Sequence, residues 1–372
     1  MSHARRSYGK ALTDLFLSDY FVLYMSLAYF LVLVPFLPTL ATPQNLSNIL
    51  SNIWPLLVVA IGQTFVLAIA GVDLSQGAVI GLSSILCAML IATGANPDVL
   101  AKAPVWGLII DEQGGLFNGI AAAIPLAILL SLCVAALVGL LNGIAVAVIG
   151  MPAFMTTMVL MLIFGALAIY LPLSENINQL PPNFVMLGKG DLISLYFGTK
   201  AESQIPRKII YSFVTYPMVI ALAVTFCAYV ILNRTVFGRQ ILAIGSNRTA
   251  AKISGVPVTR VIILVFVMSS VCAGIASILY SGRLEAGRPT LGAGAFLLDV
   301  IGAAVIGGNS LFGGKAKIKW TFFGVLFFVL LSNTLNLMNL TAFVVDMVKG
   351  GVIVVAALLD VWRSRLLRER TS

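Results

Sequence analysis

The sequence predicts an all-α, polytopic membrane protein of about ten transmembrane helices, from its hydropathy, its scarcity of charge and the spacing of its apolar runs. Of the 372 residues, 60% are hydrophobic and 10% are charged, and the mean hydropathy is +1.03. Soluble domains are about 45–50% apolar and about 25% charged. A water-soluble fold of this length cannot bury so much apolar surface, whereas a bilayer solvates it, which argues against a soluble enzyme.

Apolar runs of spanning length recur along the chain, since a helix needs about 20 apolar residues to cross the hydrocarbon core. The first run is too long for a signal-peptide core and is expected to remain as the first spanning helix. The predicted segments are 20–40, 49–70, 74–94, 118–138, 144–172, 209–233, 257–282, 294–306, 318–340 and 343–362. The fifth contains Pro152 and is expected to be broken or tilted, and the eighth is too short to span alone.

Lys and Arg residues fall mainly in alternate connections between these segments. Fifteen of the 23, including Arg5, Arg6 and Lys10, lie in segments that ten crossings place on the side of both termini. Seven lie on the opposite side, and Lys349 lies within the last helix. Because such an excess marks the cytoplasmic side, both termini are predicted to be cytoplasmic. The net charge of +9 therefore indicates membrane topology and not nucleic-acid binding.

Two predicted outer connections, residues 95–117 and 173–208, are much longer than turns and carry charged residues. Both are expected to form extramembrane structure. The sequence leaves open whether they dock an external partner or are solvated connectors.

Within a single transmembrane domain, 1–372, the chain contains two candidate repeats, 46–172 and 256–362, on either side of an inner loop at 233–256. Each half has a Gly-rich bend that carries an acid, followed by a helix that carries asparagine. Inverted repeats of this kind are common in transporters. The residues assigned a structural or gating role are Gly71, Asp73, Ser75, Asp299, Gly307 and Gly308.

The bend at Asp73 allows two interpretations. Asp73 or Ser75 can cap the next helix by accepting a backbone N–H bond. Alternatively, Asp73 lines the translocation pathway or an inner gate. Its predicted depth near the cytoplasmic boundary favours the capping role.

The inner loop predicts a short capped helix over residues 248–254. Asn247 is placed to cap it, and Gly255 is placed to end it in a left-handed conformation. Such a helix is cationic on one side and suits a groove on a cytoplasmic partner, although an ordinary positive-inside loop is the alternative. The residues expected to couple this chain to a partner are Asn247, Arg248, Ala250, Ala251, Lys252, Ser254 and Gly255.

Polar residues within the spans are candidate functional groups, because they are costly in a bilayer. A neutral, hydroxyl-rich substrate needs amide, hydroxyl and aromatic partners, and interhelical hydrogen bonding is the alternative role for each asparagine. The residues assigned to a translocation pathway are Asn142, Phe154, Thr156, Asn333 and Asn336. Asp346 and Lys349, three residues apart on one helix, are expected to pair with each other.

Several chemistries lack the residues that they need. The only histidine is His3 and the four cysteines are widely separated, so neither a metal site nor a catalytic residue is predicted. The glycine-rich stretch before Lys315 has Asn309 and Ala316 where a phosphate-binding loop needs glycine and Ser or Thr. No nucleotide site or bound cofactor is therefore expected, and these glycines are expected to shape a tight inner bend.

Taken together, these motifs resemble the permease family of bacterial monosaccharide importers, the ribose, arabinose, xylose and autoinducer-2 type, within the branched-chain amino acid permease superfamily. The resemblance extends from about residue 45 to residue 361. Its strongest parts are residues 71–75, 237–239, 243–247, 250–255 and 302–314.

This resemblance implies the permease subunit of an ATP-binding-cassette (ABC) importer in a bacterial inner membrane, in contact with lipid. It implies a second permease copy or paralogue, cytoplasmic ATPase subunits that bind ATP and Mg²⁺, and a periplasmic substrate-binding protein. Residues 247–255 then look like the coupling helix. The substrate is expected to be a monosaccharide or similar small polyol, and related permeases handle branched-chain amino acids and nucleosides. An ion- or proton-coupled secondary transporter is the alternative.

Overall fold

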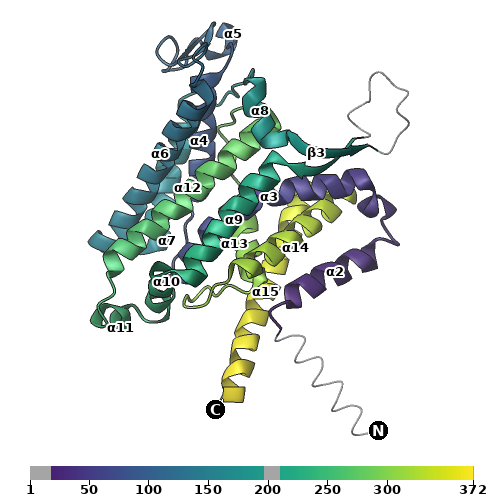
Figure 1. The fold of residues 1–372 in the computed structure, drawn as a ribbon, viewed down its shortest axis with the longest axis vertical. Helices are drawn as coiled ribbons and strands as arrows, with labels where there is room; N and C mark the ends of the chain where they lie inside the picture. The colour runs from purple at the N-terminus through teal and green to yellow at the C-terminus, as the bar shows by residue number, and fades with distance from the viewer. Residues whose placement is uncertain (1–17, 197–209, 372) are drawn as a thin grey trace.

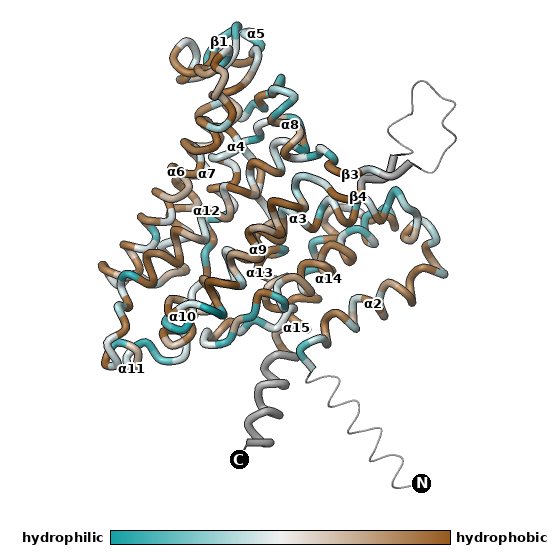
Figure 2. Tube along the Cα trace, in the orientation of Figure 1, coloured by the Kyte–Doolittle hydropathy of each residue, from teal (hydrophilic) through white to brown (hydrophobic). Residues whose placement is uncertain are grey.

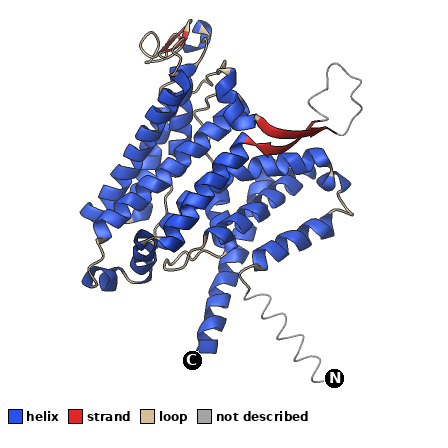
Figure 3. Ribbon diagram, viewed as in Figure 1, coloured by secondary structure: helices blue, strands red, loops and turns tan. Residues whose placement is uncertain are grey.

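The structure, a computed structural model, describes residues 18–196 and 210–371. His3, Arg5, Arg6 and Lys10 lie outside the described residues, as do residues 197–208 of the second outer connection. The described chain is helical apart from two short hairpins and the connecting loops (Figure 3). Six of its helices are long and apolar enough to cross a membrane, and three apolar helices are shorter. The predicted all-α, polytopic fold class is confirmed.

Each of the ten predicted segments contains a helix, within the part of the chain that the structure describes. In chain order these helices are α2 (Phe21–Leu33), α3 (Pro43–Ala68), α4 (Gln76–Ile91), α6 (Ala123–Ile144), α7 (Ala153–Tyr170), α9 (Tyr216–Arg234), α12 (Val258–Leu284), α13 (Phe296–Gly307), α14 (Ile318–Leu337) and α15 (Ala342–Thr371).

The remaining elements lie in the connections. They are a 3-10 turn (Pro38–Ala41), α5 (Pro97–Leu100), a π turn (Ala145–Ile149), α8 (Pro182–Lys189), α10 (Val236–Ser246) and α11 (Arg248–Ile253). The hairpins pair β1 (Ile110–Asp111) with β2 (Gly114–Gly115), and β3 (Asp191–Tyr196) with β4 (Ile210–Thr215). Residues 95–117 and the described part of 173–208 therefore contain secondary structure, as expected.

The fifth predicted segment is broken beside Pro152, as expected, but its predicted boundary with the fourth segment is wrong. α6 continues through the π turn to Ile149, and Gly150 then takes a left-handed conformation with φ +84°. Pro152 is the N-cap residue of α7, so the fifth helix begins at Ala153 and not at 144. Because apolar residues run through both helices, hydropathy alone does not mark this break.

Short contacts between connections define two ends of the molecule. The carboxylate of Asp19, just before α2, lies 2.9 Å from the ammonium of Lys317 and 2.7 Å from that of Lys319. The N–H of Gly314 donates to the carbonyl of Ala68 at the end of α3 (3.0 Å). These segments lie with α10, α11 and the C-terminal part of α15 at what we call the α11 end (Figure 1).

At the opposite end, which we call the α8 end, the long connections contact one another and the chain around them. Ile177 and Gly287 form an antiparallel bridge, and the N–H of Thr93 donates to the carbonyl of Gln179 (2.9 Å). Hydrophobic residues predominate along the helices between the two ends, and hydrophilic residues gather around α10, α11 and α8 (Figure 2). This pattern is typical of a protein that spans a bilayer.

The helices divide into central and peripheral sets. In α3, 83% of the most apolar 18-residue window is buried, and in α12 and α14 the share is 67%. The shares in α6, α9 and α7 are 28%, 22% and 17%, so these helices expose apolar surface. Burial of α3 among α12, α13 and α14 thus forms the core that positions the polar sites.

Gly139 and Gly143 bring α6 close to α12, as their GxxxG spacing predicts. A Cβ atom at Gly139 would lie 2.6 Å from the carbonyl oxygen of Phe266, and one at Gly143 would lie 2.6 Å from the Cα of Ile263. No larger residue fits these positions without moving one helix.

Candidate functional site

Two consecutive helices, α10 and α11, lie at the α11 end, and both begin with a capping side chain. The Thr235 hydroxyl accepts a bond from the N–H of Gly238 and caps α10 (3.2 Å). The side-chain oxygen of Asn247 accepts a bond from the N–H of Ala250 and caps α11 (2.9 Å). This is the cap expected from the sequence, because asparagine satisfies a free N–H of the first helical turn.

Gly255 ends α11 in the left-handed conformation expected for it, with φ +83°. Its N–H donates to the carbonyl of Lys252 (3.1 Å), and the N–H of Val256 donates to that of Ala251 (3.0 Å). These two bonds make a Schellman motif, which fixes the direction in which the chain leaves the helix.

The side chains of α11 divide between the protein and its surface. Ala251 is buried, whereas Arg248, Lys252, Ser254 and Ala250 are exposed. Ile253 is 82% exposed on the same short helix. The exposed face therefore combines two cations with apolar surface, which suits contact with another protein.

The end of α10 is interlocked with two other segments of the α11 end. A Cβ atom at Gly245 would overlap the carbonyl oxygen of Ala68 and lie 2.5 Å from the nitrogen of Gly314. One at Gly313 would lie 2.8 Å from the Cβ of Ala70. We call this three-segment contact the glycine joint. It connects α10 to the bend before α4 and to the bend between α13 and α14.

Asp73 lies at the centre of a buried network. One of its oxygens, Oδ1, accepts bonds from the N–H and the hydroxyl of Ser75 (2.9 and 2.6 Å), and the other, Oδ2, accepts one from the hydroxyl of Ser269 on α12 (2.6 Å). The amides of Asn142 on α6 and Gln76 on α4 donate to those hydroxyls (2.8 and 2.9 Å). All five residues are fully buried. The network therefore ties α4, α6 and α12 together near the middle of α12.

The capping role expected for Asp73 or Ser75 is not observed. Ser75 occupies the N-cap position of α4, but its side chain makes no capping bond. Asp73 bonds the N–H of Ser75 itself, one position too early to satisfy the first turn, and its second oxygen is used by α12. The sequence did not reveal this bond to α12, because Ser269 is distant in the chain.

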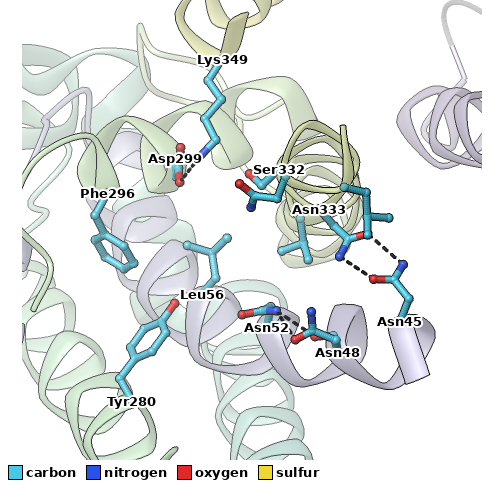
Figure 4. A pocket seen from close by; sticks show the side chains of 13 residues that line it. Asn45, Asn48, Asn52, Leu56, Tyr280, Phe296, Asp299, Ser332, Asn333 and Lys349 are labelled. Carbon is cyan, nitrogen blue, oxygen red and sulfur yellow. Dashed lines mark hydrogen bonds and ion pairs between the residues drawn. The ribbon is translucent and has the colours of Figure 1, made fainter. Parts of the chain in front are cut away.

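A cavity of about 320 Å³ lies toward the α8 end, between α3, α12, α13, α14 and α15. We call it the asparagine cavity, since five asparagines contribute to its wall (Figure 4). Its lining residues are Asn45, Asn48, Asn52, Leu56, Tyr280, Phe296, Asp299, Val329, Ser332, Asn333, Asn336, Leu337 and Lys349.

Some of these polar groups are satisfied by one another. The amides of Asn45 and Asn333 bond each other reciprocally (2.9 and 2.8 Å). Arg283 donates to the side-chain oxygens of Asn52 (2.8 Å) and Asn48 (3.2 Å) and so fixes the orientation of both amides. Polar groups without such a bond remain available to a ligand.

Asp299 and Lys349 form an ion pair across the cavity, with 2.8 Å between Oδ2 and Nζ (Figure 4). The expected pair between Asp346 and Lys349 is therefore wrong: Asp346 is exposed on α15, and Lys349 points to α13. The side chains of the pair are 18% and 12% exposed, so removal of either partner would leave an uncompensated buried charge.

The structure brings Asn333 and Asn336 together in the cavity but places the other predicted pathway residues elsewhere. Asn142 belongs to the Asp73 network. Phe154 is 55% exposed at the start of α7, and the hydroxyl of Thr156 bonds the carbonyl of Pro152 (3.1 Å). The pathway residues thus occupy separate sites.

The predicted gating residues also separate. Asp299 lies in the first turn of α13, and Gly307 and Gly308 lie at its opposite end, so the acid is not part of that bend. Gly308, with φ +110°, ends α13 at the α11 end, which agrees with a tight bend there. Gly71 lies in the chain between α3 and α4, as predicted.

Sequence reasoning missed most of the cavity, since it named only Asp299, Asn333, Asn336 and Lys349. Asn45, Asn48 and Asn52 were not selected, although the spacing i, i+3, i+7 places all three on one face of a helix. Tyr280 and Phe296 were also missed. Their ring centroids lie 5.8 Å apart at an interplanar angle of 80°. Being apolar residues in apolar runs, they give no sequence signal of their own.

A second, smaller cavity of about 190 Å³ lies among the connections of the α8 end. It is lined by residues 94–96, 99–100 and 175–179. The cavity shows that the two outer connections pack against each other, and it lies apart from the asparagine cavity.

One carboxylate outside the spans has a strongly shifted pKa. The hydrogen bond from Lys319, together with Lys317, lowers the pKa of Asp19 from 3.8 to about 2. Asp19 is therefore ionised at neutral pH and anchors the start of α2 to the start of α14.

Comparison with known proteins gives consistent matches along the chain. The family described as branched-chain amino acid transport system / permease component matches residues 45–357. The ribose import permease protein of Bacillus subtilis (strain 168) is 32% identical over 325 residues, which cover 87% of this chain and 86% of that protein. The Escherichia coli (strain K12) ribose import permease is 31% identical over 340 residues, 90% of this chain and 92% of its own.

The name of a third relative specifies a different sugar. The L-arabinose ABC transporter permease protein of Azospirillum brasilense is 28% identical over 326 residues, which cover 88% of this chain and 82% of that protein. No solved structure matches the chain.

Proposed function

The chain belongs to the family of the branched-chain amino acid transport system permease component, and we infer from this that it is the membrane-spanning subunit of an ABC importer for a monosaccharide or similar small polyol. The observation that carries the inference is similarity over most of the chain to permeases whose names specify ribose and L-arabinose. This similarity favours an ATP-driven importer over an ion- or proton-coupled carrier. The chain is a multi-pass protein of the bacterial inner membrane.

ATP hydrolysis in this proposal takes place on separate cytoplasmic ATPase subunits, which bind ATP and Mg²⁺. The exposed, capped helix α11 is the surface that we assign to them. Arg248, Lys252 and Ile253 would enter a groove of the ATPase, and Asn247 and Gly255 would hold the helix at a fixed angle. Ala251 packs inward and would connect the helix to the membrane domain.

The glycine joint supports transmission of movement from α11 into the membrane. A force on α11 reaches α10 directly, because Asn247 is the only residue between them. Gly245 at the end of α10 is in close contact with Ala68 and Gly314. Closely packed segments transmit displacement because interiors are nearly incompressible. Movement of α10 would therefore displace both inner bends together.

The candidate repeats, 46–172 and 256–362, remain part of the proposal, and helix packing supports them. α3 packs against α12, α13 and α14, and α12 packs against α3, α4 and α6. The same set of contacts results when each helix of the first repeat is exchanged with its counterpart in the second. The counterparts are α3 and α12, α4 and α13, and α6 and α14. The starts of α4 and α13 meet inside the membrane domain, since a Cβ atom at Gly77 would overlap the carbonyl oxygen of Gly292 and lie 3.4 Å from the side chain of Leu297. Two helices that begin at one level and run toward opposite ends fit an inverted repeat.

Under this exchange, the two acid-bearing sites occupy related positions at the starts of α4 and α13. Asp73 precedes α4, and Asp299 lies in the first turn of α13. Asn142 lies on α6, and Asn333 and Asn336 lie on α14. The α8 end is open at the asparagine cavity, whereas the Asp73 network is closed. In alternating access, the region around the Asp73 network would open as the asparagine cavity closes.

The charge distribution supports assignment of the α11 end to the cytoplasm. The α8 end, with the connections at 95–117 and 173–208, would then face the periplasm and receive a substrate-binding protein. Exposed apolar residues on α7 and α15, such as Leu162 and Phe343, would contact lipid or a second permease copy. No nucleic-acid partner is proposed.

Substitution of Gly255 tests the coupling assignment. Gly255→Val should abolish import and uncouple ATP hydrolysis from transport, because a β-branched residue is strongly disfavoured at φ +83°. Gly255→Asn is the matched control and should retain import, since asparagine tolerates this conformation and no atom lies within 4 Å of the added Cβ. Uptake and ATPase activity are measured together, and wild-type import by the Val variant would refute the assignment.

A further inference from the structure

We propose that the asparagine cavity is a binding site within a single permease chain for a neutral, polyhydroxylated solute of about the size of one sugar ring. The use of this site in transport rests on the proposed function. The existence of the site rests on the geometry of the cavity alone.

Unpaired polar groups supply the hydrogen bonds that such a solute needs. Within the described chain, Oδ1 of Asp299 is buried and has no hydrogen-bond partner. Ser332 and Asn336 line the cavity without a side-chain bond to another described residue. Nδ2 of Asn48 is also unbonded, since Arg283 engages only the oxygen of that amide. Donors and acceptors therefore converge on the cavity from α3, α13 and α14.

The orientation of these groups is fixed by their neighbours. Arg283 holds Asn48 and Asn52 from one side, and Asn52 donates to the backbone and side-chain oxygens of Asn48 (2.8 and 3.1 Å). Lys349 holds Asp299 through Oδ2 and leaves Oδ1 available. Preorganised groups lose little conformational entropy when a ligand binds.

The charge of the cavity selects against ions. Asp299 and Lys349 are the charged residues that line the cavity, and they neutralise each other at 2.8 Å. The guanidinium of Arg283 lies behind the wall, where the side-chain oxygens of Asn48 and Asn52 accept its hydrogen bonds. A zwitterionic amino acid could donate its ammonium to Oδ1 of Asp299, but its carboxylate would find no unpaired cation among the lining residues, and an anion would meet Asp299. A hydroxyl group can donate to Oδ1 of Asp299 with the pair intact. Neutral hydroxyls are therefore the groups that fit.

Aromatic surface and volume favour a ring. Tyr280 and Phe296 meet edge to face at one side of the cavity, opposite the amides of Asn48 and Asn52 (Figure 4). Such surfaces pack against the apolar C–H face of a sugar while amides bond its hydroxyls. The volume of about 320 Å³ is at the lower end of ligand pockets, which suits a single small ring.

Protection of an engineered cysteine tests the site directly. In the full chain, the exposed Cys133 and Cys227 are replaced by alanine, and Ser332→Cys is introduced as the reporter. The protein is placed in a lipid nanodisc, and the rate at which the reporter reacts with a small hydrophilic thiol reagent is measured. The probes are D-ribose, L-arabinose, D-galactose, D-allose and L-leucine. At least one of the four sugars should slow the reaction tenfold or more, whereas L-leucine should not.

The matched control is Ser174→Cys, which is exposed at the same end but outside the cavity and should react at the same rate with every probe. Protection of Ser332→Cys by L-leucine alone would overturn the proposal. Equal protection at both positions would also overturn it, since a general effect on the protein would then explain the result.

A second variant tests the role of the ion pair. Asp299→Ala with Lys349→Met keeps the cavity neutral but removes the Oδ1 acceptor, and should weaken sugar protection by roughly tenfold or more. Asp98→Ala, an exposed acid at the same end, is the control and should leave protection unchanged. Unchanged protection in the double variant would remove Asp299 from the site.

Uptake by cells that express the chain with its partners separates the two proposals. If one of the four sugars is imported but does not protect Ser332→Cys, the cavity assignment fails and the proposed function stands. If a sugar protects the cysteine but none is imported, the cavity assignment stands and the proposed function fails.

Discussion

At the scale of single residues, the Asp73 network and the asparagine cavity differ in how they satisfy a carboxylate. Asp73 accepts three hydrogen bonds from Ser75 and Ser269 and is fully buried. Asp299 uses one oxygen for Lys349 and leaves the other unbonded. The first arrangement closes a helix contact, whereas the second keeps a polar group available to a solute.

Ser269→Ala tests the closed arrangement. The variant removes a donor to Oδ2 of Asp73 and the acceptor of Gln76, which leaves buried polar groups unpaired at a cost of about 1–3 kcal/mol each. The midpoint of thermal unfolding in detergent should fall. Ser246→Ala is the control, because its hydroxyl bonds the carbonyl of Leu242 at an exposed position. Equal midpoints for the two variants would mean that the network contributes no stability.

The Asp19 pair makes stability depend on pH at the α11 end. Because its pKa is lowered from 3.8 to about 2, the stabilisation from Asp19 is complete above about pH 4 and is lost as pH falls through about 2. Asp19→Asn should therefore reduce the pH dependence of the unfolding midpoint across this window. An unchanged pH profile in the variant would show that the lysine contacts do not act on folding stability.

At the scale of elements, the spacing of the helices follows from small residues at their crossings. Gly139 and Gly143 allow α6 to approach α12 so closely that a Cβ atom would meet backbone atoms at 2.6 Å. Loss of either glycine forces the two helices apart or strains both.

Gly139→Leu should therefore lower the unfolding midpoint, with an overpacking cost of about 1–3 kcal/mol. Gly165→Ala on α7 is the matched control. Its nearest neighbour would be the Cβ of Ala78 at 3.8 Å, an ordinary van der Waals distance, and the added methyl group should be tolerated. Destabilisation by Gly165→Ala comparable to that by Gly139→Leu would contradict this packing argument.

The helices were largely predictable from sequence, because apolar runs and charges mark spans independently of tertiary contacts. The capped helix at 248–254 was also predictable, since Asn247 and Gly255 act on their own backbone. A break in the fifth segment was expected from Pro152, but the exact end of α6 was not predictable, because apolar residues continue to Ile149. α8 and β3 lie in a connection without a strong periodic pattern, and the fold of that connection depends on contacts such as that of Ile177 with Gly287. β4 takes up the first residues of the predicted segment 209–233, where an apolar run alone does not distinguish a strand from a helix.

Functional residues were predictable only where one helix carries the signal. Asn333 and Asn336 were selected as polar groups in an apolar run and do line the cavity. The partner of Lys349 was wrong because its nearest acid in sequence, Asp346, is not its nearest acid in space. The spacing of residues along one helix therefore does not predict ion pairs or cavity walls that are formed between helices.

At the scale of the whole molecule, the proposed transport mechanism requires that the two ends of the chain face opposite sides of the membrane. The α11 end is proposed to face the cytoplasm and the α8 end the periplasm. In the background without exposed cysteines, Thr249→Cys on α11 should react with an impermeant thiol reagent only in inside-out vesicles. Asn178→Cys, which is exposed at the α8 end, should react only in right-side-out vesicles. The reverse pattern would invert the proposed topology and place α11 beyond the reach of a cytoplasmic ATPase.

The central claim, that ATP hydrolysis on a partner drives sugar import through this chain, is tested most directly by accumulation of a labelled sugar in cells. The two conditions are deletion of the partner ATPase and addition of a protonophore while glycolysis maintains ATP. The account predicts that accumulation is lost on deletion and persists with the protonophore. Accumulation that survives deletion and collapses with the protonophore would contradict it and identify an ion-coupled carrier.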